Sequence, residues 1–239
     1  MDKQIKSKQR VRDQGEVFTN EREVKAMCDL VSQECERIDS RFLEPACGDG
    51  NFLKEILERK LDVVKQKYAK SQPDYEKNSF LACTSIYGVE LLHDNAEICR
   101  KRMFDIWDTK YSAIYKDKCD DNLRKAIEFV FNKNIVEGNA LSLMRVDESQ
   151  NDTDKPIIFT EWAFVLGDKV KRREFRLDVL LQEHEDDNSY DNIQLSIGLF
   201  DEPTDTQYWE KDPVTNVIIP KPTKEYSPVN YKEVFKNEW

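Results

Sequence analysis

Histidine is scarce in this sequence, and its cysteines are not spaced as metal ligands. The chain has 2 histidines and 6 cysteines in 239 residues, and it contains no C-x-x-C pair. Because a zinc site needs about four clustered ligands, we expect no metal centre. A Cys–His nucleophile pair stays open in principle, but the spacing favours reduced cytosolic thiols half buried in a core.

Long apolar runs are also missing. No stretch approaches the roughly 18 apolar residues of a membrane helix, so we expect no membrane span. The first residues, MDKQIKSKQRVRDQGE, contain no apolar signal core, which predicts a cytoplasmic protein. The net charge of −10 argues against a simple nucleic-acid binder, although a local basic patch is compatible with that total.

Apolar residues recur at helical and strand periods over the first two-thirds of the chain. Val24, Met27, Cys28 and Val31 have helical spacing and predict a helix capped by Thr19 or Asn20. Polar stretches at residues 69–80 and 147–155 are predicted as loops. The remaining predicted elements are a buried strand at 41–45, a helix at 51–61, a strand at 85–90, helices at 94–107 and 120–132, and strands at 134–137 and 156–160.

Strands that alternate with helices indicate an α/β fold with a mostly parallel sheet and helices on both faces. The pattern changes beyond about residue 165. Residues 169–181 fit a helix or an edge element, 183–192 an acidic loop and 193–200 a strand, and the last 40 residues hold five of the eight prolines. We therefore expect a flexible arm at 1–14, one domain at 15–165, and a partly extended C-terminal extension at 166–239.

A glycine turn follows the first predicted strand, in the string RFLEPACGDGNFL of residues 41–53. Glycine permits a tight strand-to-helix turn and lets a ligand approach the backbone closely, so a side chain at Gly50 is expected to enter the ligand's space. A dinucleotide-binding G-x-G-x-x-G motif would need a third glycine where Leu53 stands. The chain also has no G-K-S/T sequence, which excludes a phosphate-cradling loop of the ATPase kind.

The string EPACGDGNFL at residues 44–53 resembles motif I of the amino-methylating DNA methyltransferases, D/E-P-A-C-G-S-G-x-F-L. The resemblance covers roughly residues 11–160 and implies a Rossmann-like fold that uses S-adenosylmethionine. Three further blocks follow the family's order: GEVFT at 15–19, similar to G-x-x-F/Y-T-P with Asn20 replacing proline; YGVE at 87–90, similar to motif II; and VEGNAL at 136–141, similar to the G-D-A-L block with Asn139 replacing aspartate.

The resemblance also implies a role for several residues in binding the cofactor. Glu44 would meet the ammonium group, Glu90 would accept both ribose hydroxyls, and Asn139 would pair with adenine through its amide. Leu91 would pack on the adenine face, while Phe18 and Thr19 would close over the methionine moiety. The full expected set is Phe18, Thr19, Glu44, Pro45, Ala46, Cys47, Gly48, Gly50, Phe52, Glu90, Leu91, Asn139 and Ala140.

The catalytic string D/N-P-P-Y/F/W, which the family carries after its fourth strand, does not occur in this sequence. In the family it accepts hydrogen bonds from the target amino group, and its aromatic ring stacks on the flipped base. Here Glu161 offers an acceptor and Trp162 or Phe164 an aromatic ring. Packing of Trp162 in the core is an equally open reading, so the catalytic residues stay undefined.

A target-recognition domain follows the catalytic half in this class, but only about 75 residues remain here, and they are acidic. The best basic cluster is Lys169, Lys171, Arg172, Arg173 and Arg176, of which Lys171, Arg172 and Arg173 are the candidate phosphate contacts. A solvated charged face is the alternative reading of such a run.

The leading hypothesis is a DNA methyltransferase-like protein of a restriction–modification system that methylates adenine N6. It would act on DNA alone or as a subunit beside a second methyltransferase or recognition chain. One alternative is a catalytically degenerate methyltransferase fold that serves as a binding or regulatory partner. Another is a protein or RNA methyltransferase. The sequence leaves the oligomeric state open.

Overall fold

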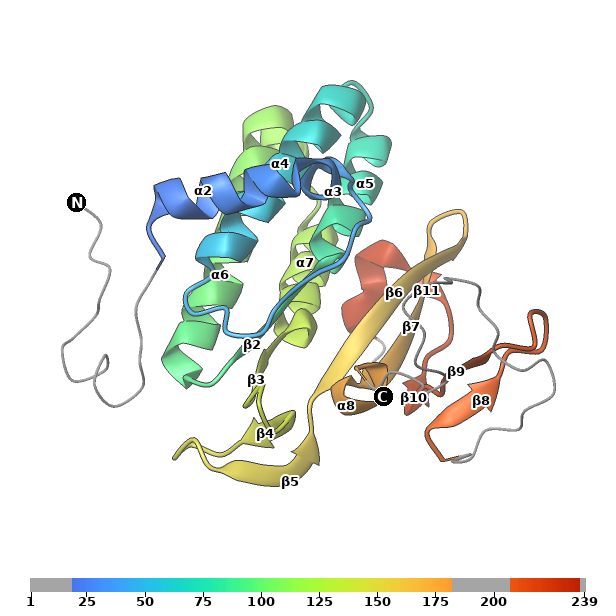
Figure 1. Cartoon of the computed structure of the whole chain (residues 1–239). Coiled ribbons are helices and arrows are strands. Elements are labelled where there is room, and N and C mark those ends of the chain that lie inside the picture. The colour runs from blue at the N-terminus through green and yellow to red at the C-terminus, as the bar shows by residue number, and fades with distance from the viewer. Residues whose placement is uncertain (1–18, 182–206, 237–239) are drawn as a thin grey trace.

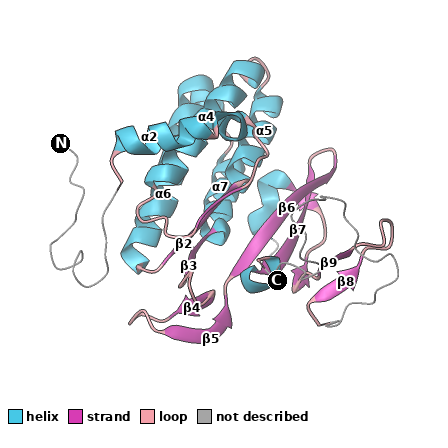
Figure 2. Ribbon diagram, viewed as in Figure 1, coloured by secondary structure: helices cyan, strands magenta, loops and turns pink. Residues whose placement is uncertain are grey.

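The computed structural model describes residues 19–181 and 207–236, which divide into a helical region and a strand-rich region (Figures 1 and 2). Several expectations lie outside the described residues. These are the arm at 1–14, the block at 15–18 with Phe18, the acidic loop at 183–192 and the strand at 193–200.

The first described helix, α2 (Glu21–Leu30), confirms the predicted cap. Asn20 accepts a hydrogen bond from the backbone N–H of Arg22 at 2.9 Å through its side-chain oxygen. Val24 and Cys28 are buried, whereas Met27 and Val31 stay about half exposed. A short helix, α3 (Ser32–Glu36), leads to the first strand.

Three parallel strands form the sheet beneath the helices: β1 (Phe42–Glu44), β2 (Ile86–Glu90) and β3 (Ile135–Glu137), in the order β1-β2-β3. Leu43 lies opposite Tyr87, and Val89 opposite Val136. All three strands were predicted from their apolar runs. However, β1 is only half buried, with Leu43 40% exposed, because it forms one edge of the described sheet.

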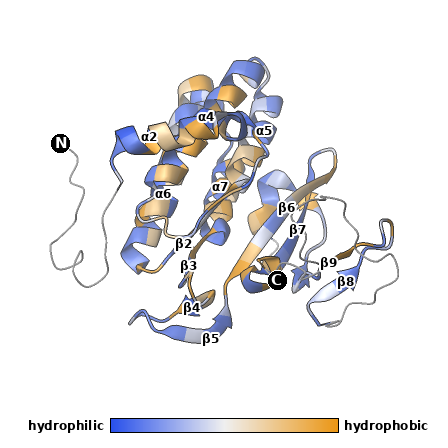
Figure 3. Ribbon diagram, in the orientation of Figure 1, coloured by the Kyte–Doolittle hydropathy of each residue, from blue (hydrophilic) through white to orange (hydrophobic). Residues whose placement is uncertain are grey.

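Four helices cover one face of this sheet: α4 (Asn51–Tyr68), α5 (Gln72–Thr84), α6 (His93–Tyr115) and α7 (Asp121–Asn134). A short turn, η1 (Lys116–Lys118), separates the last two. The apolar faces of the helices meet in one core, as their hydropathy indicates (Figure 3). The predicted loop at residues 69–80 was wrong, since α5 occupies most of it. Its buried face includes Glu76 and Ser79, and these polar residues interrupt the apolar periodicity that predicts a helix.

The other face of the sheet packs on strand residues rather than on long helices. Tyr87, Val89 and Val136 contact Ile157 and Phe159 in a second apolar cluster. Within the described residues the second face therefore carries only the short helix that begins at Leu177, and not the long helices expected on both faces.

The strand predicted at residues 156–160 is confirmed, but its expected parallel place in the first sheet was wrong. The segment opens β6 (Ile158–Leu166), which pairs antiparallel with β7 (Lys169–Arg176) in a separate sheet. No helix intervenes between β3 and β6, and a parallel neighbour would need such a crossover. Instead the chain turns back through a hairpin of β4 (Met144–Val146) and β5 (Asp152–Pro156), which replaces part of the loop expected at 147–155.

Residues 169–181 form β7 and a short helix, α8 (Leu177–Leu180), and β7 is an inner strand rather than the expected helix or edge element. Beyond the gap, β10 (Lys224–Glu225) and β11 (Val229–Asn230) pair with β7. The strands β8 (Trp209–Lys211) and β9 (Ile218–Pro220) form a hairpin beside them. The 3₁₀ turn η2 (Tyr231–Lys236) then packs against the helical region.

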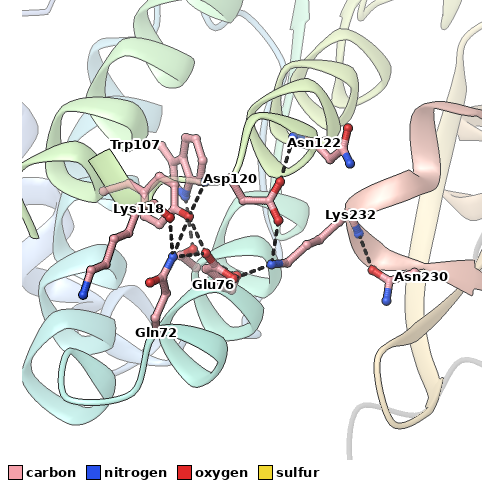
Figure 4. Close-up of polar contacts among 10 residues, drawn as sticks. Gln72, Glu76, Trp107, Lys118, Asp120, Asn122, Asn230 and Lys232 are labelled. Atoms are coloured by element: carbon pink, nitrogen blue, oxygen red, sulfur yellow. Dashed lines mark hydrogen bonds and ion pairs between the residues drawn. The ribbon is translucent and has the colours of Figure 1, made fainter. Parts of the chain in front are cut away.

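A polar network joins this C-terminal turn to the helices (Figure 4). The Lys232 ammonium lies 2.5 Å from Glu76 and 2.9 Å from Asp120. Tyr111 and Gln72 also donate to Glu76, which is 2% exposed. A buried carboxylate needs such partners, so Lys232 ties the end of the described chain to α5 and α7.

Candidate functional site

A cavity of about 490 Å³ lies at the carboxyl ends of β1, β2 and β3. Its walls come from the turn after β1, the first residues after β2, the loop after β3, and Thr19 ahead of α2. Ligands of open α/β sheets bind at such strand ends, and the volume suits a small molecule.

The turn after β1 is held in place by backbone hydrogen bonds. Gly48 and Gly50 adopt left-handed φ values of 55° and 90°, which favour glycine. The N–H of Cys47 donates to the carbonyl of Val89 at 3.0 Å, and the N–H of Gly50 donates to the carbonyl of Cys47 at 2.8 Å. These bonds fix the start of α4 against β2, so the cavity wall is already formed.

Glu90, the last residue of β2, accepts hydrogen bonds from residues on both sides of the cavity. One carboxylate oxygen accepts from the N–H of Gly48 at 2.8 Å. The other accepts from the N–H of Leu92 at 3.1 Å and from the side chain of Asn95 at 3.2 Å. A carboxylate has about four lone-pair positions, so roughly one remains for a ligand hydroxyl, rather than the two expected from sequence.

Glu44, at the end of β1, is an acidic lining residue that forms no ion pair with the described residues. Burial raises the pKa of its carboxyl above the usual range, and a hydrogen bond from the backbone of Ala46 opposes this only in part. No Lys or Arg side chain of the described residues lowers that pKa. A positively charged ligand group would therefore be stabilised beside Glu44.

Asn139 lies in the loop after β3, in the same cavity wall. Its amide nitrogen donates to Asp152 at 3.0 Å, and its amide oxygen accepts from the N–H of Leu141 at 3.0 Å. An amide carries two donor hydrogens and two acceptor lone pairs. One donor and one acceptor therefore remain for a ligand, which is the pairing capacity that adenine requires.

Most of the residues that the sequence nominated for the cofactor line this one cavity. Of the described members of that set, only Gly50 does not. A Cβ on Gly50 would meet Cys99 Sγ at 2.7 Å and Met103 Cε at 3.1 Å, both in α6. The expected clash of a side chain at this position is therefore with the helix packing and not with the ligand.

Sequence reasoning missed several lining residues: Asp49, Asn51, Leu92, Asn95, Gly138 and Leu141. Asp49 and Asn51 alternate with the glycines of the turn, and that position was the available signal. The side chain of Asn51 donates to the carbonyl of Thr19 at 3.4 Å and accepts from Arg102 at 2.8 Å. These contacts join the segment before α2 to the cavity.

The three catalytic candidates lie outside the described lining of the cavity. Trp162 is buried, donates to Asn134 at 2.9 Å and meets Phe80 edge-on. Phe164 packs on the same Phe80 ring. Glu161 pairs with Arg41 at 3.0 Å and with Arg173 at 2.5 Å. These contacts are those of core packing and of an ion-pair cluster.

The basic cluster on β7 is drawn into ion pairs and core contacts. Arg172 is 4% exposed, with its guanidinium 3.5 Å from the ring centroid of Tyr226. Lys171 pairs with Glu225 at 2.8 Å. The expected phosphate contacts at Lys171, Arg172 and Arg173 therefore have acidic or aromatic neighbours within the chain.

Other kinds of site find little support in the described ranges. All six cysteines are free thiols, and five of them are buried. Residues 19–181 and 207–236 contain no group of three His, Cys, Asp or Glu side chains placed to hold a metal ion. No helix within the same ranges has the length and apolar character needed to cross a membrane.

Comparison with known proteins adds one finding. Residues 9–198, about four fifths of the chain, match the family described as MmeI, DNA-methyltransferase domain. The match includes the whole cavity and the β6–β7 hairpin. No curated protein and no solved structure matches the chain.

Proposed function

Because the chain belongs to the family of the MmeI DNA-methyltransferase domain, we propose that it binds S-adenosylmethionine in the cavity at the ends of β1, β2 and β3. Membership of this family makes it a DNA methyltransferase-like protein of the restriction–modification type. We further propose that the three parallel strands are one half of a Rossmann-like sheet, and that the target atom is adenine N6 in cytoplasmic DNA.

The unpaired acidic group in the cavity carries the proposal. Glu44 is the group to bind the ammonium of the cofactor, since its partly buried carboxylate has no cation beside it among the described residues. Glu90 would accept one ribose hydroxyl, Leu91 would pack on adenine, and Asn139 would pair with the adenine edge. Thr19, with Phe18 ahead of it, would cover the methionine moiety. The bound cofactor supplies an electrophilic methyl group.

The proposed role in methyl transfer is that of one subunit of a split enzyme. Orientation of the target amino group needs acceptors beside the cofactor, and the D/N-P-P-aromatic string that would supply them is missing from these 239 residues. The substitute candidates Trp162 and Phe164 are held in the core. We propose that a second polypeptide supplies the catalytic turn, together with sequence recognition.

A regulatory protein with a degenerate methyltransferase fold is the second candidate function. The ion pairs of Glu161 with Arg41 and Arg173 favour it, because they occupy the one acidic side chain of β6. In that case the cavity would still bind cofactor, but transfer would not depend on this chain.

Calorimetry with S-adenosylmethionine tests the binding proposal. We expect one site in the wild type and affinity lowered about 10- to 100-fold in Glu44→Gln, the loss of one charge-assisted contact. Glu97→Gln, an exposed change on α6 outside the cavity, is the matched control. Absence of binding in the wild type would refute the proposal.

Labelled methyl transfer to unmethylated DNA, with and without a co-encoded neighbour protein, separates the two functions. Transfer only with both proteins, lost when this chain carries Glu44→Gln, is expected for a split enzyme. Transfer by the neighbour alone at the full rate supports the regulatory candidate.

A further inference from the structure

The edge of the parallel sheet at β1 is open in the described part of the chain. There β1 pairs with β2 alone, and β6 pairs with β7 alone. Doubly wound sheets that begin in the order 3-2-1 continue beyond strand 1 with strand 4, and ligands bind where the order reverses. The position beside β1 is therefore the one from which a fourth strand would reach the cofactor cavity.

Apolar side chains stand exposed on both sides of this edge. On one side, a groove of about 640 Å³ between β1 and β6 is lined by Phe159, Phe175 and Leu177, with Leu180 and Leu181 43% and 54% exposed. On the other, a hollow of about 220 Å³ against α2 and α4 includes the half-exposed Met27 and Val31. Leu43 lines both.

We propose that this edge receives an extended, apolar strand from a partner polypeptide, which pairs parallel to β1 and carries the catalytic turn at its carboxyl end. A parallel strand buried on both faces is apolar on both, and the hollows on either side of Leu43 match that chemistry. Exposed strand edges bind extended segments through backbone hydrogen bonds, with side-chain pockets for specificity.

The charges at the groove favour an acidic residue ahead of the partner's apolar strand. Glu161 is shared between Arg41 and Arg173, which leaves the cluster with a net charge of +1. Arg41 immediately precedes β1 and keeps 61% of its side chain exposed. At the opposite end of β1, Glu44 lines the cofactor cavity, so the partner's strand would run from the basic cluster toward the cofactor.

The inference rests on the proposed function, which is the reason to expect a catalytic partner. Its test measures peptide binding and does not require cofactor binding. The probe is a labelled synthetic peptide of about 12 residues: an acidic residue, five alternating valines and isoleucines, a glycine, and Asn-Pro-Pro-Tyr. Fluorescence anisotropy measures its affinity, and a scrambled peptide is the control. Hydrogen exchange of residues 41–46 reports pairing at the edge.

We expect the probe to bind and to slow exchange in residues 41–46 by about tenfold or more. Leu43→Lys and Leu180→Lys should each weaken binding about tenfold or more. Leu166→Lys, at the exposed end of β6, should leave the affinity unchanged. Circular dichroism and urea unfolding check that each variant is folded, so failure of this test and failure of the cofactor proposal remain distinguishable.

Four outcomes would overturn the inference. They are no binding of the probe, equal binding of the scrambled peptide, equal binding by Leu43→Lys, and an edge already protected in the chain alone. In the last case, protection lost on removal of residues 182–206 would assign the groove to this chain's own segment. Protection that is lost when the protein is diluted would assign the groove to a second copy of this chain.

Discussion

Replacement of Gly50 by alanine tests the packing of the turn after β1. Gly50 has a φ of 90°, and its Cβ would lie 2.7 Å from Cys99 Sγ and 3.1 Å from Met103 Cε. The left-handed conformation costs a non-glycine residue about 1–2 kcal/mol, and forcing a methyl group into a packed core costs about 1–3 kcal/mol. We therefore expect Gly50→Ala to lower the unfolding free energy by about 2–5 kcal/mol.

Gly167 provides the matched control, since it also has a positive φ of 56° but has no atom within 4 Å of its ideal Cβ. Gly167→Ala should lose only the conformational contribution, about 1–2 kcal/mol. Urea unfolding followed by circular dichroism measures both variants, and an unchanged slope validates the comparison.

A double variant separates the clash from the backbone strain. Cys99→Ala removes the sulfur nearest to the new methyl group, so Gly50→Ala should cost about 1 kcal/mol or more less in that background. Equal losses in Gly50→Ala and Gly167→Ala, with no coupling to Cys99, would show that the packing of α4 on α6 is not as described.

Three further predictions concern charge and packing. Cofactor affinity should fall as the pH drops from about 7 toward about 4.3, the ordinary pKa of glutamate. Burial raises the pKa of Glu44, and protonation removes the carboxylate that the ammonium needs. Calorimetry over this pH range should find no such fall in Glu44→Gln. Trp162→Phe should cost about 1–3 kcal/mol through the lost hydrogen bond to Asn134 without changing cofactor affinity; weakened methyl transfer at unchanged stability would instead favour a catalytic role. Lys232→Met should cost about 3 kcal/mol in urea unfolding because it leaves buried Glu76 without its cation, whereas Lys236→Met, which breaks an exposed pair with Glu233, should cost under about 1 kcal/mol.

The residues of the cavity could be predicted because they follow strands in sequence. Each strand end brings a short run of residues to the same edge of the sheet, so Glu44, Glu90 and Asn139 meet although they are distant in the chain. Missed residues such as Asn95 do not directly follow a strand in the sequence. Asn95 lies in the cavity wall, where it forms a hydrogen bond to Glu90. Their role depends on side-chain geometry that periodicity does not report.

The direction of the fourth strand was wrongly predicted for a different reason. Residues 156–160 have the composition of a buried parallel strand, and β6 is indeed buried where it packs on Tyr87 and Phe80. Composition does not report strand direction, however, and the absence of a crossover helix after β3 decides that direction. Helix α5 was missed because its packing contacts use polar groups, as between Ser79 and Trp107.

The ion pair of Lys232 with Glu76 and Asp120 could not have been predicted either. It joins positions 156 and 112 residues apart in the sequence. The contact shows that the described C-terminal segment packs on α5 and α7, a contact that the predicted partly extended C-terminal extension did not specify.

A crystal structure of the chain grown with saturating S-adenosylmethionine tests the central claim most directly. The account predicts density for the cofactor at the ends of β1, β2 and β3, with its ammonium beside Glu44 and its adenine between Leu91 and Asn139. Cofactor density at any other place, or an empty cavity in crystals of protein that binds the cofactor in solution, would contradict it.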